Sequence, residues 1–537
     1  MEKLVESRPI DAVFNNIKKH PYLCVILSCA FLLPFGLCQY QNITDASVIT
    51  EAIIWILGIG ALIIFGKPSR SNKVNLYLLA SNELLIILFT IFVLTNNENA
   101  NLMFVPFLIG LIQLSIVLYR EKAISAERLA ILLVALGIVV RFCYVIRIDC
   151  QTMQHDVYNF QGTYGHEGYI MYWYNNGLKL PDFDIRTVVQ YYHPPLHHIL
   201  MALLLKIFTI FGIELTIAQE AIQILPMLYS SLAMVVCCRI FGLIKLRGIG
   251  FVLATAIVCF HPTFIIWGGA YNNDMLSALF MLTAIMWTLK WYQNPCLLRI
   301  LPIAVCVGCG MMTKLSAWMV APAIAFVFLW VFIKNIKRPL PFIGQFAAFG
   351  AVCVPLGLWW GIRNLLAFGV PITYVWDTKV MSMSVQDIPA VQRLFDFSFF
   401  QFDYPFEAFQ TGGAAYNEFN PLIGLLKTSL FDELKTLWNF EGIATALVLL
   451  AGLIAIACFV GLCYTMFSKK TGPDGITKLF FAVIFLTIMI SYYIFCFQFP
   501  YVCTENIRYC MPIIPLLALG LGFGVNALKT KICKKQP

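Results

Sequence analysis

The chain has 537 residues, of which 60% are hydrophobic and 12% are charged. Soluble domains have about 45–50% apolar and about 25% charged residues, so this composition excludes a soluble globular enzyme: too few polar side chains remain to cover a water-facing surface. The net charge of +9 would suggest a nucleic-acid partner in a soluble protein, whereas in a membrane protein it marks cytoplasmic loops. We therefore expect an all-α polytopic membrane protein, surrounded by membrane lipid and without a nucleic-acid partner.

Apolar runs predict five membrane spans before residue 149, because each run is long enough to cross a hydrocarbon core of about 30 Å. They lie near 21–38, 51–66, 75–95, 102–119 and 129–148. Lys and Arg residues cluster before the first of these runs and after the second and fourth, whereas the loops at 39–50 and 96–101 contain none. Because positive charge favours cytoplasmic loops, we expect a cytoplasmic amino terminus and an extracytoplasmic segment at 149–195.

The run at 196–213 has the apolar character of a sixth span, but counting it as one would place the next basic loop, with Arg239 and Arg247, outside. An interfacial helix at 196–213 removes this conflict for every later basic loop. The later spans are then expected near 219–238, 249–266, 275–292, 299–313, 317–333, 341–363, 442–466, 478–498 and 508–527. This topology has about fourteen spans and both termini in the cytoplasm.

Four regions follow from this topology. Residues 1–128 form a four-helix extension, and 129–366 form the core, which includes the first outer loop and the interfacial helix. Residues 367–441 form an outer-face loop with short amphipathic helices, and 442–537 hold the carboxy-terminal spans.

The first outer loop concentrates chemistry, with five carboxylates, five histidines and seven tyrosines in residues 149–198. A solvated loop of ordinary polar composition is one interpretation. The other is sugar recognition, because aromatic faces pack on C–H groups while carboxylates and imidazoles bond hydroxyls. Asp156, beside His155, is either a general base for an acceptor hydroxyl or a helix N-cap. Glu167 is the second candidate base, with Asp149, Asp182 and Asp184 as weaker ones.

A second polar group, GGAYNND, lies at 268–274 between an outward and an inward span. One of Asn272, Asn273 and Asp274 would suffice to cap the inward helix. The others, together with Tyr271, are candidates for substrate binding.

Three cations, Lys314, Arg363 and Arg508, are each expected at the outer end of a different span. Each one alone could extend its charged end to the interface. Together they are typical of a site for an anion such as a phosphate at headgroup depth.

The 18 cysteines show no metal-ligand spacing, and most lie within apolar runs. They are interpreted as buried hydrophobic residues, although Cys150, Cys503 and Cys510 fall near one membrane face, where pairing is open. We assign no metal ligands and expect no cofactor. A bound divalent metal is kept as an alternative.

These motifs resemble integral-membrane glycosyltransferases of the C-type fold (GT-C), in particular glycosyltransferase family 39, with the protein O-mannosyltransferases and the lipid A aminoarabinose transferases. The resemblance covers about 129–527 and rests on the order and spacing of HD at 155–156, YHPPLHH at 192–198, YNND at 271–274, TK at 313–314, WWGIRN at 359–364 and IRY at 507–509. It implies a GT-C core and maps the family's acidic base onto Asp156. The family commonly has Asp-Glu where this chain has His-Asp, which keeps Glu167 as an alternative. Substrate contacts would then come from His155, Tyr192, His193 and His197 as well as from 271–274.

The resemblance implies a membrane glycosyltransferase that moves a sugar from a polyprenyl-phosphate donor to a hydroxyl of a glycan, lipid or protein acceptor, with inversion, on the outer face of a bacterial plasma membrane. A transporter or flippase of a lipid-linked saccharide is the alternative. A transporter would place ionisable residues near the bilayer midplane and often contains inverted repeats, whereas here these residues gather at the outer face.

Overall fold

The computed structural model describes residues 16–17, 19–40, 119, 122, 124–151, 154, 156, 159–376, 384–397, 419–432 and 441–533. Within this part of the chain the protein is all-α. Its β-structure there is limited to one isolated β-bridge, between Ser384 and Tyr501. Eight of its helices are long and apolar enough to cross a membrane. The expected all-α polytopic membrane protein is therefore confirmed.

The helices of the first half are α2 (Pro21–Tyr40), α6 (Ala126–Val145), α7 (Gly165–Asn176), α8 (Leu196–Ile210), α9 (Leu215–Ala221), α10 (Ile224–Leu243), α11 (Gly248–Phe260) and α12 (Pro262–Ile266). Those of the second half are α13 (Asp274–Gln293), α14 (Leu297–Thr313), α15 (Ala321–Lys334), α16 (Leu340–Phe368), α17 (Ala390–Phe395), α18 (Pro421–Phe431), α19 (Glu441–Phe467), α20 (Gly475–Gln498) and α21 (Ile513–Cys533). Short 3-10 turns lie at η2 (Ile185–Thr187), η3 (Leu315–Val320), η8 (Val502–Thr504) and η9 (Ile507–Cys510).

Each predicted span that falls on described residues overlaps one of these helices. The predicted spans at 51–66, 75–95 and 102–119 lie outside the described residues, apart from Tyr119. The predicted span at 508–527 begins later, because residues 507–510 form the turn η9 and α21 starts at Ile513. The proposed interfacial segment is helix α8, whose 15 residues span about 22 Å, less than the hydrocarbon core.

Glycines allow three helices of the bundle, α11, α19 and α21, to approach closely. A Cβ on Gly520 of α21 would lie 2.5 Å from the amide nitrogen of Leu462 in α19, and one on Gly461 would lie 2.6 Å from the carbonyl oxygen of Gly520. On another side of α21, a Cβ on Gly250 of α11 would overlap the carbonyl oxygen of Gly522. Small residues let helix backbones touch in membranes, so α21 packs directly against both α11 and α19.

Arg141 is fully buried inside the bundle. Its guanidinium donates to Ser230 Oγ at 2.7 Å and to the carbonyl oxygens of Cys259 and Gly137 at 2.7 and 2.9 Å. The arginine thus joins α6 to α10 and α11 through hydrogen bonds to uncharged groups.

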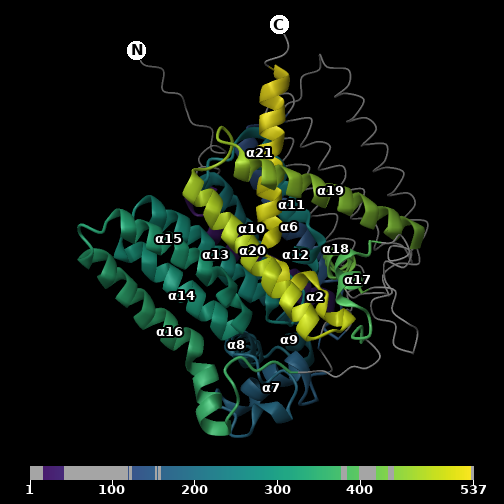
Figure 1. The fold of residues 1–537 in the computed structure, drawn as a ribbon. Coiled ribbons are helices and arrows are strands. Elements are labelled where there is room, and N and C mark those ends of the chain that lie inside the picture. The colour runs from purple at the N-terminus through teal and green to yellow at the C-terminus, as the bar shows by residue number, and fades with distance from the viewer. Residues whose placement is uncertain are drawn as a thin grey trace, which may run out of the picture.

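A smaller layer covers the end of the bundle opposite the carboxy-terminal end of α21 (Figure 1). It consists of α7, α8 and the segment between them, which bury a second apolar cluster with Tyr169, Trp173, Tyr191, Met201 and Leu205 at its centre. This layer lies beside the carboxy-terminal end of α16 in Figure 1. The first outer loop of the sequence therefore folds into an ordered cap, which forms one wall of the site described next.

Candidate active site

A cavity of about 680 Å³ lies where this cap meets the helix ends. Six of the residues singled out in the sequence line it: Asp156, Tyr192, His193, Asn272, Lys314 and Arg508. They come from the first outer loop, the loop before α13, the turn after α14 and η9. Segments more than 350 residues apart in the chain thus meet here, and Asp156, Lys314 and Arg508 lie at the same end of the bundle, as the charge-based topology requires.

Asp156 and Arg508 form an ion pair in this cavity. Arg508 Nη1 lies 3.3 Å from Asp156 Oδ2, and the side chain of Arg508 is 8% exposed whereas that of Asp156 is 43% exposed. Asp156 has a left-handed backbone with φ of 53°, which a non-glycine residue adopts at some cost. Its carbonyl oxygen accepts the amide hydrogen of His166 at 3.0 Å. The strained backbone and this bond hold the carboxylate at the cavity wall.

The N-cap interpretation of Asp156 finds no support in the described residues. Helix α7 begins nine positions later at Gly165, with Tyr164 at its N-cap. The neighbouring His155, expected to contact substrate, lies outside the described residues.

Lys314 and Asp274 form a second ion pair. The side chains are 13% and 3% exposed, and Lys314 ends α14 while Asp274 begins α13. Burial lowers the pKa of the Lys314 ammonium, and the carboxylate of Asp274 opposes that shift. Asn273 donates to the carbonyl oxygen of Thr313 at 2.8 Å, so the loop before α13 is fastened to the end of α14 and presents the ammonium to the cavity.

The aromatic ring of Tyr509 lies close to both cations. Lys314 Nζ is 5.0 Å from its centroid, and Arg508 Cζ is also 5.0 Å away. Trp267 lies 5.6 Å from the guanidinium of Arg508. Aromatic faces stabilise cations, so these rings hold both positive charges at one wall of the cavity.

The histidines of the cap form one group, in which His166, His197 and His198 are buried and His193 is partly exposed at the cavity. His166 Nδ1 lies 2.8 Å from His198 Nε2, and the rings of His166 and His193 are stacked at 5.7 Å. Burial lowers the pKa of His166 to about 3 and that of His193 well below its usual range. These imidazoles are therefore neutral at physiological pH and can form hydrogen bonds but do not supply charge.

His197 and Tyr271 do not appear among the described lining residues of the cavity. His197 Nε2 donates to the carbonyl oxygen of Tyr271 at 2.8 Å, and the Tyr271 hydroxyl donates to the carbonyl oxygen of Gln219 at 2.7 Å. Both side chains join α8 to the 271–274 loop and to α9, behind the cavity wall.

Arg363 points elsewhere. Its guanidinium donates to the carbonyl oxygen of Pro181 and, at 2.7 Å, to Asn364 Oδ1, and it packs over Trp360 and Phe368. It does not belong to the described lining of the cavity. The structure therefore places Arg363 on the cap, away from the two cations with which the sequence grouped it.

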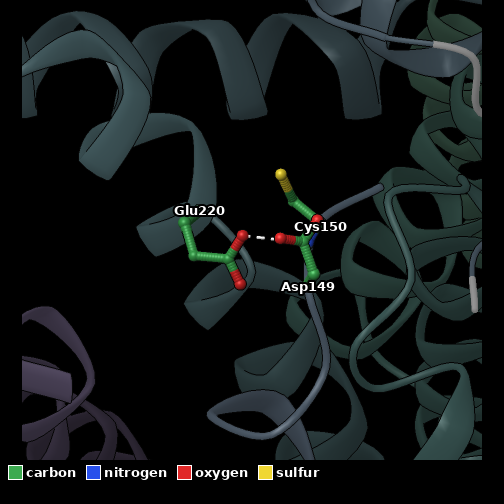
Figure 2. Close-up of side chains that lie close together, drawn as sticks. All are labelled: Asp149, Cys150 and Glu220. Carbon is green, nitrogen blue, oxygen red and sulfur yellow. Dashed lines mark hydrogen bonds between the residues drawn. The ribbon is translucent and has the colours of Figure 1, made fainter. Parts of the chain in front are cut away.

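The remaining acidic candidates lie away from the described cavity lining. Glu167 is fully buried in the first turn of α7. Asp182 faces Lys179 at 3.8 Å in an exposed pair, and Asp184 bonds Arg186. Asp149 lies at the start of the outer loop beside Cys150 and Glu220, where Glu220 Oε2 accepts the amide hydrogen of Cys150 at 2.8 Å (Figure 2). Asp156 is thus the carboxylate that meets the cavity.

Two of the three cysteines expected near one face, Cys150 and Cys510, form no disulfide within the described part of the chain.

Sequence reasoning missed the aromatic part of the cavity. Trp318 of η3, Trp360 of α16, Tyr374 and Phe495 of α20 line it together with the charged residues. The sequence pattern that could have predicted this aromatic wall is the gathering of aromatic residues at the ends of predicted spans, as in WWGIRN at 359–364. An aromatic wall beside two cations suits a ligand with an anionic group and an apolar or sugar portion.

Neither a protein-family model nor a curated protein matches this chain. Among solved structures, it is similar to ArnT from Cupriavidus metallidurans bound to undecaprenyl phosphate, at 15% identity and a TM-score of 0.41, over 74% of this chain and 60% of that one. It is also similar to the same protein in the apo state, at 16% identity and a TM-score of 0.32, over 76% of this chain and 80% of that one. The chain spans only 60% of the length of the first of these structures.

Proposed function

We propose that the protein is a membrane glycosyltransferase that moves a sugar from a polyprenyl-phosphate donor to an acceptor hydroxyl at the extracytoplasmic face. The observation that carries this proposal is the meeting of Asp156, Arg508 and Lys314 in one cavity with an aromatic wall. Two cations suit a phosphate, a carboxylate beside them suits proton removal, and aromatic rings suit a sugar. The undecaprenyl phosphate bound by ArnT supports the same class of carrier.

In the proposed reaction, Arg508 and Lys314 bind the donor phosphate. The acceptor oxygen forms a bond to the anomeric carbon while the bond from that carbon to the phosphate oxygen breaks. The acceptor proton passes to Asp156, and the polyprenyl phosphate leaves with its added negative charge neutralised by the two cations. Asn272, Tyr192 and His193 line the same cavity and are the proposed sugar contacts.

The Asp156–Arg508 contact has to open during this cycle. Inversion requires the base and the leaving phosphate to lie on opposite sides of the anomeric carbon, whereas the two side chains are 3.3 Å apart. A sugar therefore enters between them, and the phosphate replaces the carboxylate as the partner of Arg508. Donor binding would in this way free the base at the moment it is needed.

A panel of undecaprenyl-phosphate sugars, incubated with the purified protein in lipid nanodiscs, tests this proposal. Consumption of one sugar donor, with release of undecaprenyl phosphate detected by mass spectrometry, is the expected result. Movement of a donor across liposomes without consumption would instead indicate a transporter and would contradict the proposal.

A further inference from the structure

Arg508 is carried by the segment 499–510, and this segment is held in place from outside the bundle. Helices α17 and α18, which belong to the outer segment after α16, pack against it. Val385 donates its amide hydrogen to the carbonyl oxygen of Pro500 at 2.9 Å, and Ile507 donates to Thr428 Oγ1 at 3.0 Å. The described parts of this outer segment therefore support the arginine that faces the cavity.

A buried ion pair fixes the same segment. Arg393 of α17 donates to Glu505 Oε1 at 2.9 Å, and their side chains are 3% and 1% exposed. The guanidinium also donates to the carbonyl oxygens of Cys496, at 3.1 Å, and Phe419, at 3.3 Å, and lies 4.6 Å from the centroid of Phe497. One side chain thus joins α17, the end of α20, the start of α18 and Glu505.

The link from Glu505 to Arg508 is short. Asn506, which follows Glu505, accepts the amide hydrogen of Arg508 on Oδ1 at 2.9 Å and donates to Asp432 Oδ1 at 2.9 Å. Packing leaves little freedom here, since a Cβ on Gly424 would lie 2.8 Å from the Cβ of Glu505. A shift of Glu505 would therefore move the backbone at Asn506 and the start of η9.

We infer that Arg393 is a positioning residue for the donor site. Through Glu505 it fixes the position of the backbone from which Arg508 reaches the phosphate. This inference rests on the function proposed above. Taking two opposite charges out of water is a poor source of stability, because the desolvation penalty offsets the attraction. A planar guanidinium with several directed donors instead fixes geometry. Helices α17 and α18 thereby support the donor site, although none of their residues belongs to the described cavity lining.

The experiment measures binding of undecaprenyl phosphate to the full-length protein in nanodiscs. The double variant Arg393→Met with Glu505→Met removes the ion pair without leaving a buried charge unpaired. We expect its affinity to fall about tenfold or more, because displacements of about 1 Å have large effects on such contacts, while its unfolding temperature stays close to that of the parent. Turnover at saturating donor should change by less than about threefold, since bound donor can still recruit Arg508.

Two further variants keep the test decisive. Arg186→Met is the control. Arg186 also pairs with a carboxylate and donates to a carbonyl oxygen at a helix end, that of Phe368, but it lies away from η9. The affinity of this variant for undecaprenyl phosphate should be unchanged. Arg393→Lys keeps a cation opposite Glu505 but loses the planar fork, and it should lie between the parent and the double variant. It also decides the question if the double variant does not fold.

The outcomes separate the two proposals. If Arg508→Gln leaves the affinity for undecaprenyl phosphate unchanged, the proposed function is wrong. If Arg508→Gln weakens binding but folded double and Arg393→Lys variants bind normally, only the positioning role is wrong.

Discussion

At the scale of single residues, the cavity pairs each cation with a carboxylate, yet the two pairs differ in exposure. Lys314 and Asp274 are buried together, whereas Asp156 is 43% exposed on the open side of its pair with Arg508. An exposed carboxylate can exchange partners and meet an acceptor, whereas a buried one is held. This difference favours Asp156 as the proposed base and a supporting role for Asp274.

The base assignment predicts the behaviour of Asp156→Asn. This variant keeps the shape of the side chain but loses the basic oxygen, so it should fold and bind donor while transferring sugar at least about a hundredfold more slowly. Glu167→Gln, placed away from the described cavity lining, should keep most of its turnover if it folds. Steady-state transfer rates check both variants. Normal turnover in Asp156→Asn with loss of turnover in Glu167→Gln would make Glu167 the base.

The anion-site assignment predicts a contrast between two arginines. Arg508→Gln should weaken the binding of undecaprenyl phosphate by about tenfold or more, because it removes a charge-assisted contact to the phosphate. Arg363→Gln should leave that affinity within about twofold, because its guanidinium bonds Pro181 and Asn364. Calorimetric titration measures both affinities. If both variants lost affinity for undecaprenyl phosphate equally, Arg363 would also belong to the phosphate site.

At the scale of helices, hydropathy predicted the elements well. The apolar runs matched helices wherever residues are described, since a membrane requires long uninterrupted helices. The partners of particular side chains were not predictable. Arg508 and Asp156 are separated by 352 positions, and Arg393 and Glu505 by 112. Nothing in the local pattern around Arg363 distinguishes a guanidinium facing the cavity from one facing Pro181.

The close contact between α19 and α21 gives a prediction at this scale. Gly520→Ala should destabilise the protein by about 1–3 kcal/mol, because the added methyl group would lie 2.5 Å from the Leu462 amide nitrogen and the helices would have to separate. Gly344→Ala in α16 is the control, since it meets nothing within 4 Å. Thermal unfolding in detergent compares the two. Alanine has a higher helix propensity than glycine, so Gly344→Ala should be neutral or slightly stabilising. Equal unfolding temperatures of the two variants would show that the contact at Gly520 tolerates the added methyl group.

At the scale of the whole molecule, the buried histidines connect the stability of the cap to pH. The folded pKa of His166, about 3, lies below its ordinary value of 6.5, so between these values the unfolded chain binds more protons than the folded one. Stability is therefore retained above about pH 6.5 and is lost as the pH falls towards about 3.

His166→Gln tests this dependence, because the amide can still bond His198 but does not titrate in this range. We expect the fall in unfolding temperature between about pH 7.5 and about pH 5 to be smaller in the variant than in the parent. An identical fall in both would assign the acid sensitivity to other groups.

The shortness of α14 bears on how far the proposed reaction lies from water. Its 17 residues extend about 26 Å, less than the hydrocarbon thickness of about 30 Å. In the proposed topology the basic residues near its start, Lys290 and Arg299, are cytoplasmic, which would place Lys314 at its end below the outer surface of the bilayer. An acceptor anchored in lipid is held at that depth, whereas one dissolved in water has to leave its solvent to reach it. A lipid-anchored acceptor should accordingly be used at least about tenfold more efficiently than its head group alone, and comparable kcat/KM for the two would show that the reacting centre opens to bulk water.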